Sequence, residues 1–259
     1  MRISASSYSN TAPLIWSFLY GSRHGSAEVI LDNAPSRSAA LLAGRRVDAA
    51  LVPVIAYQTI PDLFVVPDVC VGAREKVRSV CLVTKGNDLS QIGSVALDTS
   101  SRTSVALTKI IFREFFAGDP EWIDHEPDVD SMLESADCAL LIGDPALTLD
   151  QEYRKFDLVE IWKRYTDFGF VFAMWMTGNR ELEIDFNGAR DEGLTHLDAI
   201  IANYSDEISL ADDEMREYLT ENISFRPDES MKEGLKLYFS LAKKHGLIEE
   251  ARPIRFVQS

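Results

Sequence analysis

The feature that most limits the fold of this chain is an internal repeat. Residues 29–41 match residues 95–107 after one deletion, and in each copy a β-rich run ends on an aspartate, Asp32 or Asp98. A Ser-Arg-Ser or Ser-Arg-Thr turn and a helical pattern follow in both copies. Two lobes of this βαβ design would direct helix N-termini and strand ends at a shared cleft. The pattern leaves an alternative open, since any two βαβ units share such a run and a hydroxyl N-cap.

Short β-rich runs alternate with helical patterns from the first half of the chain onward, which predicts an α/β protein with a largely parallel sheet. We expect strands at residues 28–31, 48–52, 79–84, 94–98, 138–142 and 171–176, and helices at residues 36–43, 103–116, 131–136 and 158–165. Charged helical patterns at 186–204, 210–219 and 228–245 predict a C-terminal helical layer. The expected division is residues 1–88 plus 178–259 in the first lobe and residues 89–177 in the second, with the ligand cleft between them.

Composition narrows the classes of partner. The chain has 259 residues with 26 Lys and Arg against 41 Asp and Glu, a net charge of -15, so its surface should repel nucleic acid and anionic lipid. No apolar stretch approaches the length of a membrane span, and the first residues lack the pattern of a secretory signal. The three cysteines are widely spaced in apolar runs, which is typical of buried thiols in a reducing compartment. We therefore expect a cytoplasmic protein with no nucleic-acid or membrane partner.

Hydroxyl and other hydrogen-bond donors gather at the predicted strand-to-helix turns. The residues are Ser9, Asn10 and Thr11 near the start of the chain, Ser36 and Ser38 in the first repeat copy, and Ser100, Ser101, Thr103 and Ser104 in the second. Helix N-termini bind anions, so converging termini would hold a carboxylate or phosphate ligand. Arg37 and Arg102 occupy equivalent positions and could neutralise such an anion. For each hydroxyl, plain N-capping is the alternative, and for each arginine, a solvated surface position.

Several catalytic signatures are missing from the sequence. It has no dinucleotide-binding glycine fingerprint, no Walker A lysine loop and no Gly-x-Ser-x-Gly elbow, and its four histidines are not spaced as metal ligands. We expect no cofactor and no metal, so an enzyme of this sequence would act by positioning and hydrogen bonding. In the aromatic run around Gly169, Phe170, Phe172 and Met174 would share a strand face, where Phe170 could contact a planar ligand or belong to the core.

Seven segments, in order along nearly the whole chain, resemble the chorismate dehydratases of the futalosine route to menaquinone. They include the run at residues 7–14, the turn at Pro35 and Ser36, residues 47–53, residues 78–80, residues 97–104, residues 141–147 and residues 157–162 leading to 170–173. The resemblance implies a two-lobed type II periplasmic-binding-protein-like fold with a ligand cleft. One departure is the segment at residues 165–169, which replaces a more usual turn and affects only the shape of one wall.

The resemblance also implies a reaction, in which chorismate loses water to give 3-[(1-carboxyvinyl)oxy]benzoate. The small-molecule substrate would be chorismate, and its enolpyruvyl carboxylate would take the proton while Asn10 and Ser79 position that group and the leaving hydroxyl. Asp144 is the competing base. The substrate-binding residues implied by the motifs are Ser9, Thr11, Ser36, Ser101, Arg102, Thr103, Ser104, Gly143 and Phe170.

Other functions stay open at this stage. The sister 1,4-dihydroxy-6-naphthoate synthase shares the fold but depends on a cleft histidine, and here His125 and His196 lie in no recognisable cleft motif. A noncatalytic solute-binding protein for a small carboxylate would ordinarily carry a secretory signal. A ligand-sensing domain of a transcription factor would need a DNA-binding appendage, for which no basic segment exists. The sequence does not indicate the oligomeric state.

Overall fold

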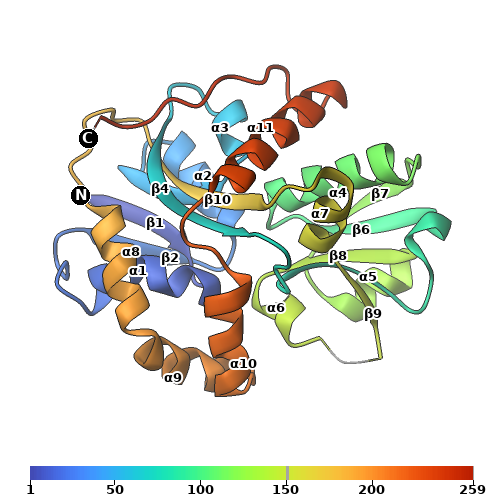
Figure 1. The fold of residues 1–259 in the computed structure, drawn as a ribbon, viewed down its shortest axis with the longest axis horizontal. Helices are drawn as coiled ribbons and strands as arrows, with labels where there is room; N and C mark the ends of the chain where they lie inside the picture. The colour runs from blue at the N-terminus through green and yellow to red at the C-terminus, as the bar shows by residue number, and fades with distance from the viewer. Residues whose placement is uncertain (150–151, 259) are drawn as a thin grey trace.

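Two five-stranded sheets lie side by side and form two lobes (Figure 1). This computed structural model describes residues 1–149 and 152–258. The strand order is β2-β1-β3-β10-β4 in the first sheet and β7-β6-β8-β5-β9 in the second. The predicted two-lobed α/β architecture is thereby confirmed. No helix within the described ranges has both the length and the apolar composition that crossing a bilayer requires.

The first lobe and the second each begin with alternating strands and helices, and the C-terminal segment is helical. The elements are β1 (Arg2–Ser6), η1 (Ser9–Thr11), α1 (Ala12–Leu19), β2 (Glu28–Asp32), α2 (Pro35–Ala43), β3 (Ala49–Pro53), α3 (Ala56–Thr59), β4 (Phe64–Ala73), β5 (Val80–Thr84), η2 (Leu89–Gln91), β6 (Ser94–Asp98), α4 (Arg102–Phe115), β7 (Glu121–His125), α5 (Val129–Ser135), β8 (Cys138–Ile142), α6 (Asp144–Leu147), β9 (Arg154–Asp157), α7 (Leu158–Thr166), β10 (Phe170–Thr177), α8 (Phe186–Thr195), α9 (Leu197–Ile208), α10 (Asp212–Glu217), the π-helical turn η3 (Tyr218–Asn222) and α11 (Glu229–Lys244).

Both sheets are mixed, which corrects the expectation of a largely parallel sheet. Strands β1, β2 and β3 are parallel to one another, as are β6, β7 and β8, and these are the βαβ units of the repeat. Strand β10 is antiparallel to β3 and β4, and β5 is antiparallel to β8 and β9. The antiparallel pairs arise because β5 and β10 each enter their sheet from the other lobe.

The same exchange of strands shifts the lobe boundaries. With divisions at residues 88/89 and 177/178, β5 would fall in the first lobe and β10 in the second. The hydrogen-bonded ladders instead place β5 in the second sheet and β10 in the first. The sequence identified both segments as strands, but a strand's composition does not determine the neighbour with which it pairs. The chain therefore crosses between lobes at residues 74–79 and 167–169.

The C-terminal helices form the predicted covering layer, although the pattern at residues 186–204 contains two helices, α8 and α9. Helix α8 packs on α1, and α11 packs on both β10 and α4, so α11 spans the two lobes beside the crossing segments (Figure 1). Gly234 of α11 allows this close approach, because a Cβ there would lie 2.1 Å from the backbone oxygen of Gly169. The three cysteines are buried and free, as predicted.

The first crossing segment is held by a buried carboxylate. Asp157 caps α7 by accepting bonds from the backbone N–H groups of Val159 (2.9 Å) and Glu160 (3.2 Å). Its other oxygen accepts from the N–H groups of Val77 (3.0 Å) and Arg78 (2.6 Å). Burial raises the pKa of Asp157 to about 6, and these N–H donors oppose that rise. One side chain thus ties the start of α7 to the crossing segment.

Asp157→Asn tests this arrangement through the pH dependence of stability. A native pKa of about 6, above the ordinary 3.8, means that folding takes up a proton, so this contribution to stability is full below about pH 3.8 and is lost as the pH rises through 6. Asparagine does not titrate. The difference in unfolding free energy between wild type and variant should therefore move in favour of the wild type by up to about 3 kcal/mol between pH 7 and pH 4. Urea unfolding at both pH values measures it, and a difference that does not change with pH would contradict the prediction.

Candidate functional site

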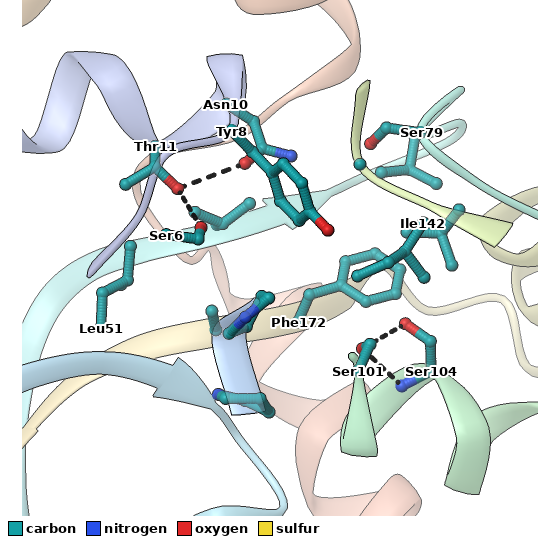
Figure 2. A pocket seen from close by; sticks show the side chains of 17 residues that line it. Ser6, Tyr8, Asn10, Thr11, Leu51, Ser79, Ser101, Ser104, Ile142 and Phe172 are labelled. Atoms are coloured by element: carbon teal, nitrogen blue, oxygen red, sulfur yellow. Dashed lines mark hydrogen bonds between the residues drawn. The ribbon is translucent and has the colours of Figure 1, made fainter. Parts of the chain in front are cut away.

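A small cavity lies between the two lobes, where β1, β3 and β10 of the first sheet face β5, β8 and α4 of the second (Figure 2). Its volume is about 60 Å³. The polar part of its lining consists of uncharged groups: Ser6, Tyr8, Asn10, Thr11, Ser79, Ser101, Ser104 and the backbone of Gly143. The apolar part consists of Pro35, Leu51, Pro53, Val71, Val77, Val80, Ile142, Phe172 and Ala173.

Three helix N-termini meet at this cavity. Asn10 and Thr11 precede α1, Pro35 opens α2, and Ser101 is the N-cap of α4. Each terminus carries the positive end of a helix dipole, and two of the first-turn N–H groups are already bonded, that of Ser36 to Ser100 O and that of Ser104 to Ser101 Oγ. The convergence that the repeat predicted is therefore present, and its chemistry suits an anionic ligand.

The N-terminus of α4 also shows which of its serines caps the helix. Ser101 Oγ accepts from the backbone N–H of Ser104 at 3.3 Å and donates to Ser104 Oγ at 2.9 Å. The turn before it is shaped by Asp98, which accepts from the Ser100 N–H (2.9 Å) and Oγ (2.5 Å). Burial raises the pKa of Asp98. Ser101 is thus both a structural cap and a wall of the cavity, and no bond among the described residues uses the hydroxyl hydrogen of Ser104.

Asn10 and Ser79 reach the cavity from opposite lobes and share a partner that the sequence analysis missed. The Asn10 amide nitrogen donates to the Tyr218 hydroxyl at 2.9 Å, and that hydroxyl donates to Ser79 Oγ at 2.8 Å. Thr11 Oγ1 donates to Asn10 Oδ1 at 3.4 Å and bonds Ser6 Oγ at 2.9 Å. Both bonds are drawn in Figure 2. Tyr218 belongs to the segment at residues 210–219, which was predicted to be a helix of the C-terminal layer. No sequence signal marked Tyr218 as a residue of the site.

Asp144 and Ser9 contact each other across the cleft and lie outside the cavity lining. The Asp144 carboxylate accepts from Ser9 Oγ at 2.5 Å and from the Ser9 N–H at 3.0 and 3.2 Å. Burial raises the pKa of Asp144, and the bonds from Ser9 oppose the rise. The pair joins the start of η1 in the first lobe to the start of α6 in the second. In this geometry Ser9 and Asp144 form a contact between the two lobes.

Four other predicted ligand contacts also lie outside the lining. Ser36 donates its backbone N–H to Ser100 O at 3.1 Å, and Thr103 Oγ1 accepts from Ile55 N at 3.4 Å, so both join the lobes. Arg102 is exposed. Phe170 is fully buried among aromatic rings and belongs to the core.

The neighbouring Phe172 reaches the cavity instead, because a β-bulge interrupts the alternation of β10. The register with β4 shifts between Val171 and Ala173. Phe172 and Ala173 line the cavity, whereas Val171 and Met174 line a separate hollow under α11. The expectation that Phe172 and Met174 share one face was therefore wrong, since the sequence carries no mark of the bulge.

Tyr8 projects into the cavity from the segment after β1, within a motif that the sequence analysis quoted (Figure 2). Burial, opposed by a hydrogen bond with Ser100 and assisted by the nearby Asp98 and Asp144, raises the pKa of Tyr8 to about 12. Its ring packs against Gly143, whose φ of 68° and ψ of -153° lie in a region that essentially only glycine occupies. Gly143 N donates to Ser79 O at 2.8 Å, which fixes the second wall beside Ser79.

Comparison with known proteins shows the family of the chain that carries this site. A family model described as menaquinone biosynthesis matches residues 1–244. A chorismate dehydratase of Thermus thermophilus is 30% identical over 256 residues, which cover 89% of this chain and 91% of that protein. The chain belongs to the menaquinone biosynthesis family. The family resemblance inferred from the seven motifs is confirmed.

Solved structures agree with the fold of this menaquinone biosynthesis protein. A crystal structure from Archaeoglobus fulgidus matches with a TM-score of 0.74 at 17% identity, covering 95% of this chain and 98% of that one. The periplasmic aliphatic sulphonate binding protein of Escherichia coli matches with a TM-score of 0.65 at 15% identity, covering 100% and 94%. These likenesses confirm the periplasmic-binding-protein-like fold and carry no further information on the ligand.

Gly143→Ala tests the contact with Tyr8. A Cβ at residue 143 would lie 2.7 Å from two carbons of the Tyr8 ring, so alanine adds a clash to the backbone strain. Gly246→Ala is the matched control, because Gly246 has a φ of 67° but nothing within 4 Å of its Cβ position. We expect Gly143→Ala to lower the unfolding free energy by at least about 2 kcal/mol more than Gly246→Ala in urea titrations. Equal losses would contradict the clash.

Proposed function

We propose that this protein is a chorismate dehydratase, a carbon-oxygen lyase that converts chorismate to 3-[(1-carboxyvinyl)oxy]benzoate and water. The observation that carries the proposal is the pair Asn10 and Ser79, which line one cavity from opposite lobes at a junction of three helix N-termini. The name of the Thermus thermophilus relative supports it. The free, buried cysteines support a reducing compartment, and we place the reaction in the cytoplasm.

Chorismate carries two carboxylates, and the cavity provides neutral donors for them. The N-termini of α1, α2 and α4 would bind these anions through helix dipoles, backbone N–H groups and the Ser104 hydroxyl. Each favourable helix end contributes about 0.3–1 kcal/mol, and up to about 2 kcal/mol where it is partly buried. Because the lining contains no fixed positive charge, neither carboxylate is bound so tightly that it loses its basicity.

The chemical step removes the C3 hydrogen and the C4 hydroxyl of the ring. In the proposed mechanism the enolpyruvyl carboxylate of the substrate takes the C3 proton, the C3–H electron pair forms the new ring double bond, and the C4–O bond breaks. Asn10 holds the carboxylate in position, and the Ser79 hydroxyl donates a hydrogen bond to the departing oxygen, which leaves as water by taking up the proton that the carboxylate removed from C3. Aromatisation of the ring drives the reaction, so the protein supplies orientation and polarisation.

The two alternatives receive less support from the site. A naphthoate synthase mechanism needs a cleft histidine, and no histidine of the described residues lines the cavity. His196 stacks on Trp16 at 3.9 Å, and His125 bonds the backbone of Glu126. A solute-binding protein would use the same helix termini, but it has no need of Asn10 and Ser79 joined through a buried tyrosine. We therefore favour the enzyme.

Purified protein incubated with chorismate alone tests the proposal. We expect loss of water from chorismate, detected by mass spectrometry, and we expect it to persist after dialysis against EDTA because the lining offers uncharged donors and no His, Cys or carboxylate ligand within the described residues. The control is chorismate incubated without protein. Chorismate left unchanged by folded protein would overturn the assignment, and activity that EDTA abolishes and a divalent ion restores would overturn the cofactor-free mechanism.

Asp144→Asn separates the substrate carboxylate from Asp144 as the base. Asparagine keeps one oxygen that can accept from Ser9, so we expect measurable turnover with kcat within about tenfold of wild type. Removing a true general base costs about 10²- to 10⁴-fold. Ser9→Ala removes the hydroxyl bond to Asp144 and keeps the bonds from the Ser9 N–H, so its kcat should also stay within about tenfold of wild type. A loss above 10²-fold for Asp144→Asn alone, with native circular dichroism, would make Asp144 the base.

A further inference from the structure

Tyr218 stands directly behind the two residues to which the proposed reaction assigns the chemistry. It has no exposed surface, and it lies in the π-helical turn η3, where the N–H of Ile223 bonds the carbonyl of Tyr218 at 3.0 Å. Short π-helical turns occur frequently at functional sites. Its hydroxyl joins Asn10 of the first lobe to Ser79 at the start of β5.

The bonding partners of this tyrosine differ from those of comparable buried tyrosines. Tyr57 is 2% exposed, and its hydroxyl donates to the carbonyl of Pro253 (2.8 Å) and accepts from the N–H of Arg255 (2.9 Å). Tyr238, fully buried, donates to the carbonyl of Thr103 at 3.1 Å. Backbone partners are the usual way to satisfy a buried hydroxyl. Tyr218 bonds two side chains, and both line the cavity.

The direction of each hydrogen follows from counting donors. The single hydroxyl hydrogen of Thr11 is committed to Asn10 Oδ1, so Ser6 must be the donor in its bond with Thr11. The Asn10 amide then faces Tyr218 with its NH2 group, which leaves the Tyr218 hydrogen for Ser79. The hydrogens therefore run in one direction, from Ser6 to Ser79.

Ser79 is the last acceptor in this series of hydrogen bonds, and its own hydroxyl hydrogen is unused. Its Oγ takes the hydrogen of Tyr218, and in the described part of the chain no bond uses the hydrogen of Ser79 itself. Successive hydroxyl bonds polarise one another, which strengthens the last hydroxyl as a donor. Burial raises the pKa of Tyr218, so the phenol stays protonated and keeps donating. The remaining direction for the Ser79 hydrogen is the cavity that this residue lines.

We propose that Tyr218 is a positioning residue, whose hydroxyl orients the Asn10 amide and turns the Ser79 hydroxyl hydrogen toward the leaving oxygen of the substrate. The inference rests on the proposed dehydratase function, since it assigns Ser79 the role of donor in that reaction. Tyr218 itself touches no substrate. It acts by fixing the orientations of the Asn10 amide and the Ser79 hydroxyl before the substrate binds, whereas without Tyr218 each group could adopt several orientations.

Tyr218→Phe removes the hydroxyl and keeps the ring. Because Ser79 would lose its fixed orientation, we expect kcat for chorismate to fall at least tenfold while KM stays within about threefold, since a bond to the departing oxygen strengthens only in the transition state. Tyr57→Phe is the matched control, as it removes a buried hydroxyl with one donated and one accepted bond, and neither Tyr57 nor its partners Pro253 and Arg255 line the cavity. It should lower the melting temperature comparably and leave kcat within twofold of wild type.

A double-mutant cycle distinguishes positioning from general stabilisation. If Tyr218 acts through Ser79, then Ser79→Ala combined with Tyr218→Phe should be no slower than Ser79→Ala alone, because the oriented donor is already gone. If the kcat losses of the two single variants multiply in the double variant, the inference is overturned. It is also overturned if Tyr218→Phe is as active as Tyr57→Phe. Both results leave the dehydratase assignment intact. A wild-type protein that does not consume chorismate would overturn both.

Substitution of Tyr218 by 3-fluorotyrosine covers the case in which Tyr218→Phe does not fold. The analogue keeps the shape and the hydroxyl but is a stronger donor, so an oriented Ser79 should respond with a change in kcat of at least twofold while the melting temperature stays within a few degrees. An unchanged kcat in the fluorinated protein would count against the inference.

Discussion

The cleft depends on how residues 77–79 are held as the chain crosses from the first sheet to the second. Asp157 fixes the backbone N–H groups of Val77 and Arg78, Gly143 N donates to Ser79 O, and Tyr218 donates to Ser79 Oγ. The bonds with Asp157 and Gly143 come from the second lobe, and the bond from Tyr218 comes from the C-terminal helical layer. Because three elements restrain one short segment, Ser79 is placed with little freedom, as a group that acts by orientation requires.

Neutral donors in the cavity explain how a protein of strongly negative net charge could bind the proposed anionic substrate. A surface with a net charge of -15 repels a dicarboxylate, and the screened repulsion falls off over about 8 Å at physiological ionic strength. Inside the cavity the relevant groups are the N-termini of α1, α2 and α4, which attract anions at short range without a side-chain cation. The same choice keeps the substrate carboxylate basic, since a bidentate arginine would lower its pKa. The proposed substrate-assisted mechanism is therefore consistent with a cavity that lacks charge.

The local sequence pattern predicted most of the fold, and it failed for features that depend on contacts between segments distant in the sequence. All six expected strands occur, because β-branched runs between turn residues are a local signal. Strands β1, β4, β7 and β9 were missed, since β1 is short and Ser-rich, β7 and β9 are charged, and Pro67 interrupts β4. Likewise the repeat predicted converging helix N-termini, including Ser101 and Ser104, whereas Tyr218 and Phe172 depend on a packed helix and on a bulge that leave no trace in the sequence.

The cavity is smaller than the ligand that its chemistry suits, and this difference indicates what must move. A volume of about 60 Å³ lies well below the roughly 300 Å³ at which ligand pockets usually begin. For the proposed substrate chorismate to enter, the lobes would have to separate, and within the described residues the chain passes between the two sheets at residues 74–79 and 167–169. Contacts that would break include Ser9 with Asp144, Ser36 with Ser100 and Ile55 with Thr103, each worth on the order of 1 kcal/mol. Since Ser79 lies in one link and Asn10 in the first lobe, such an opening would move the two residues apart, and their alignment through Tyr218 belongs to the closed arrangement of the lobes.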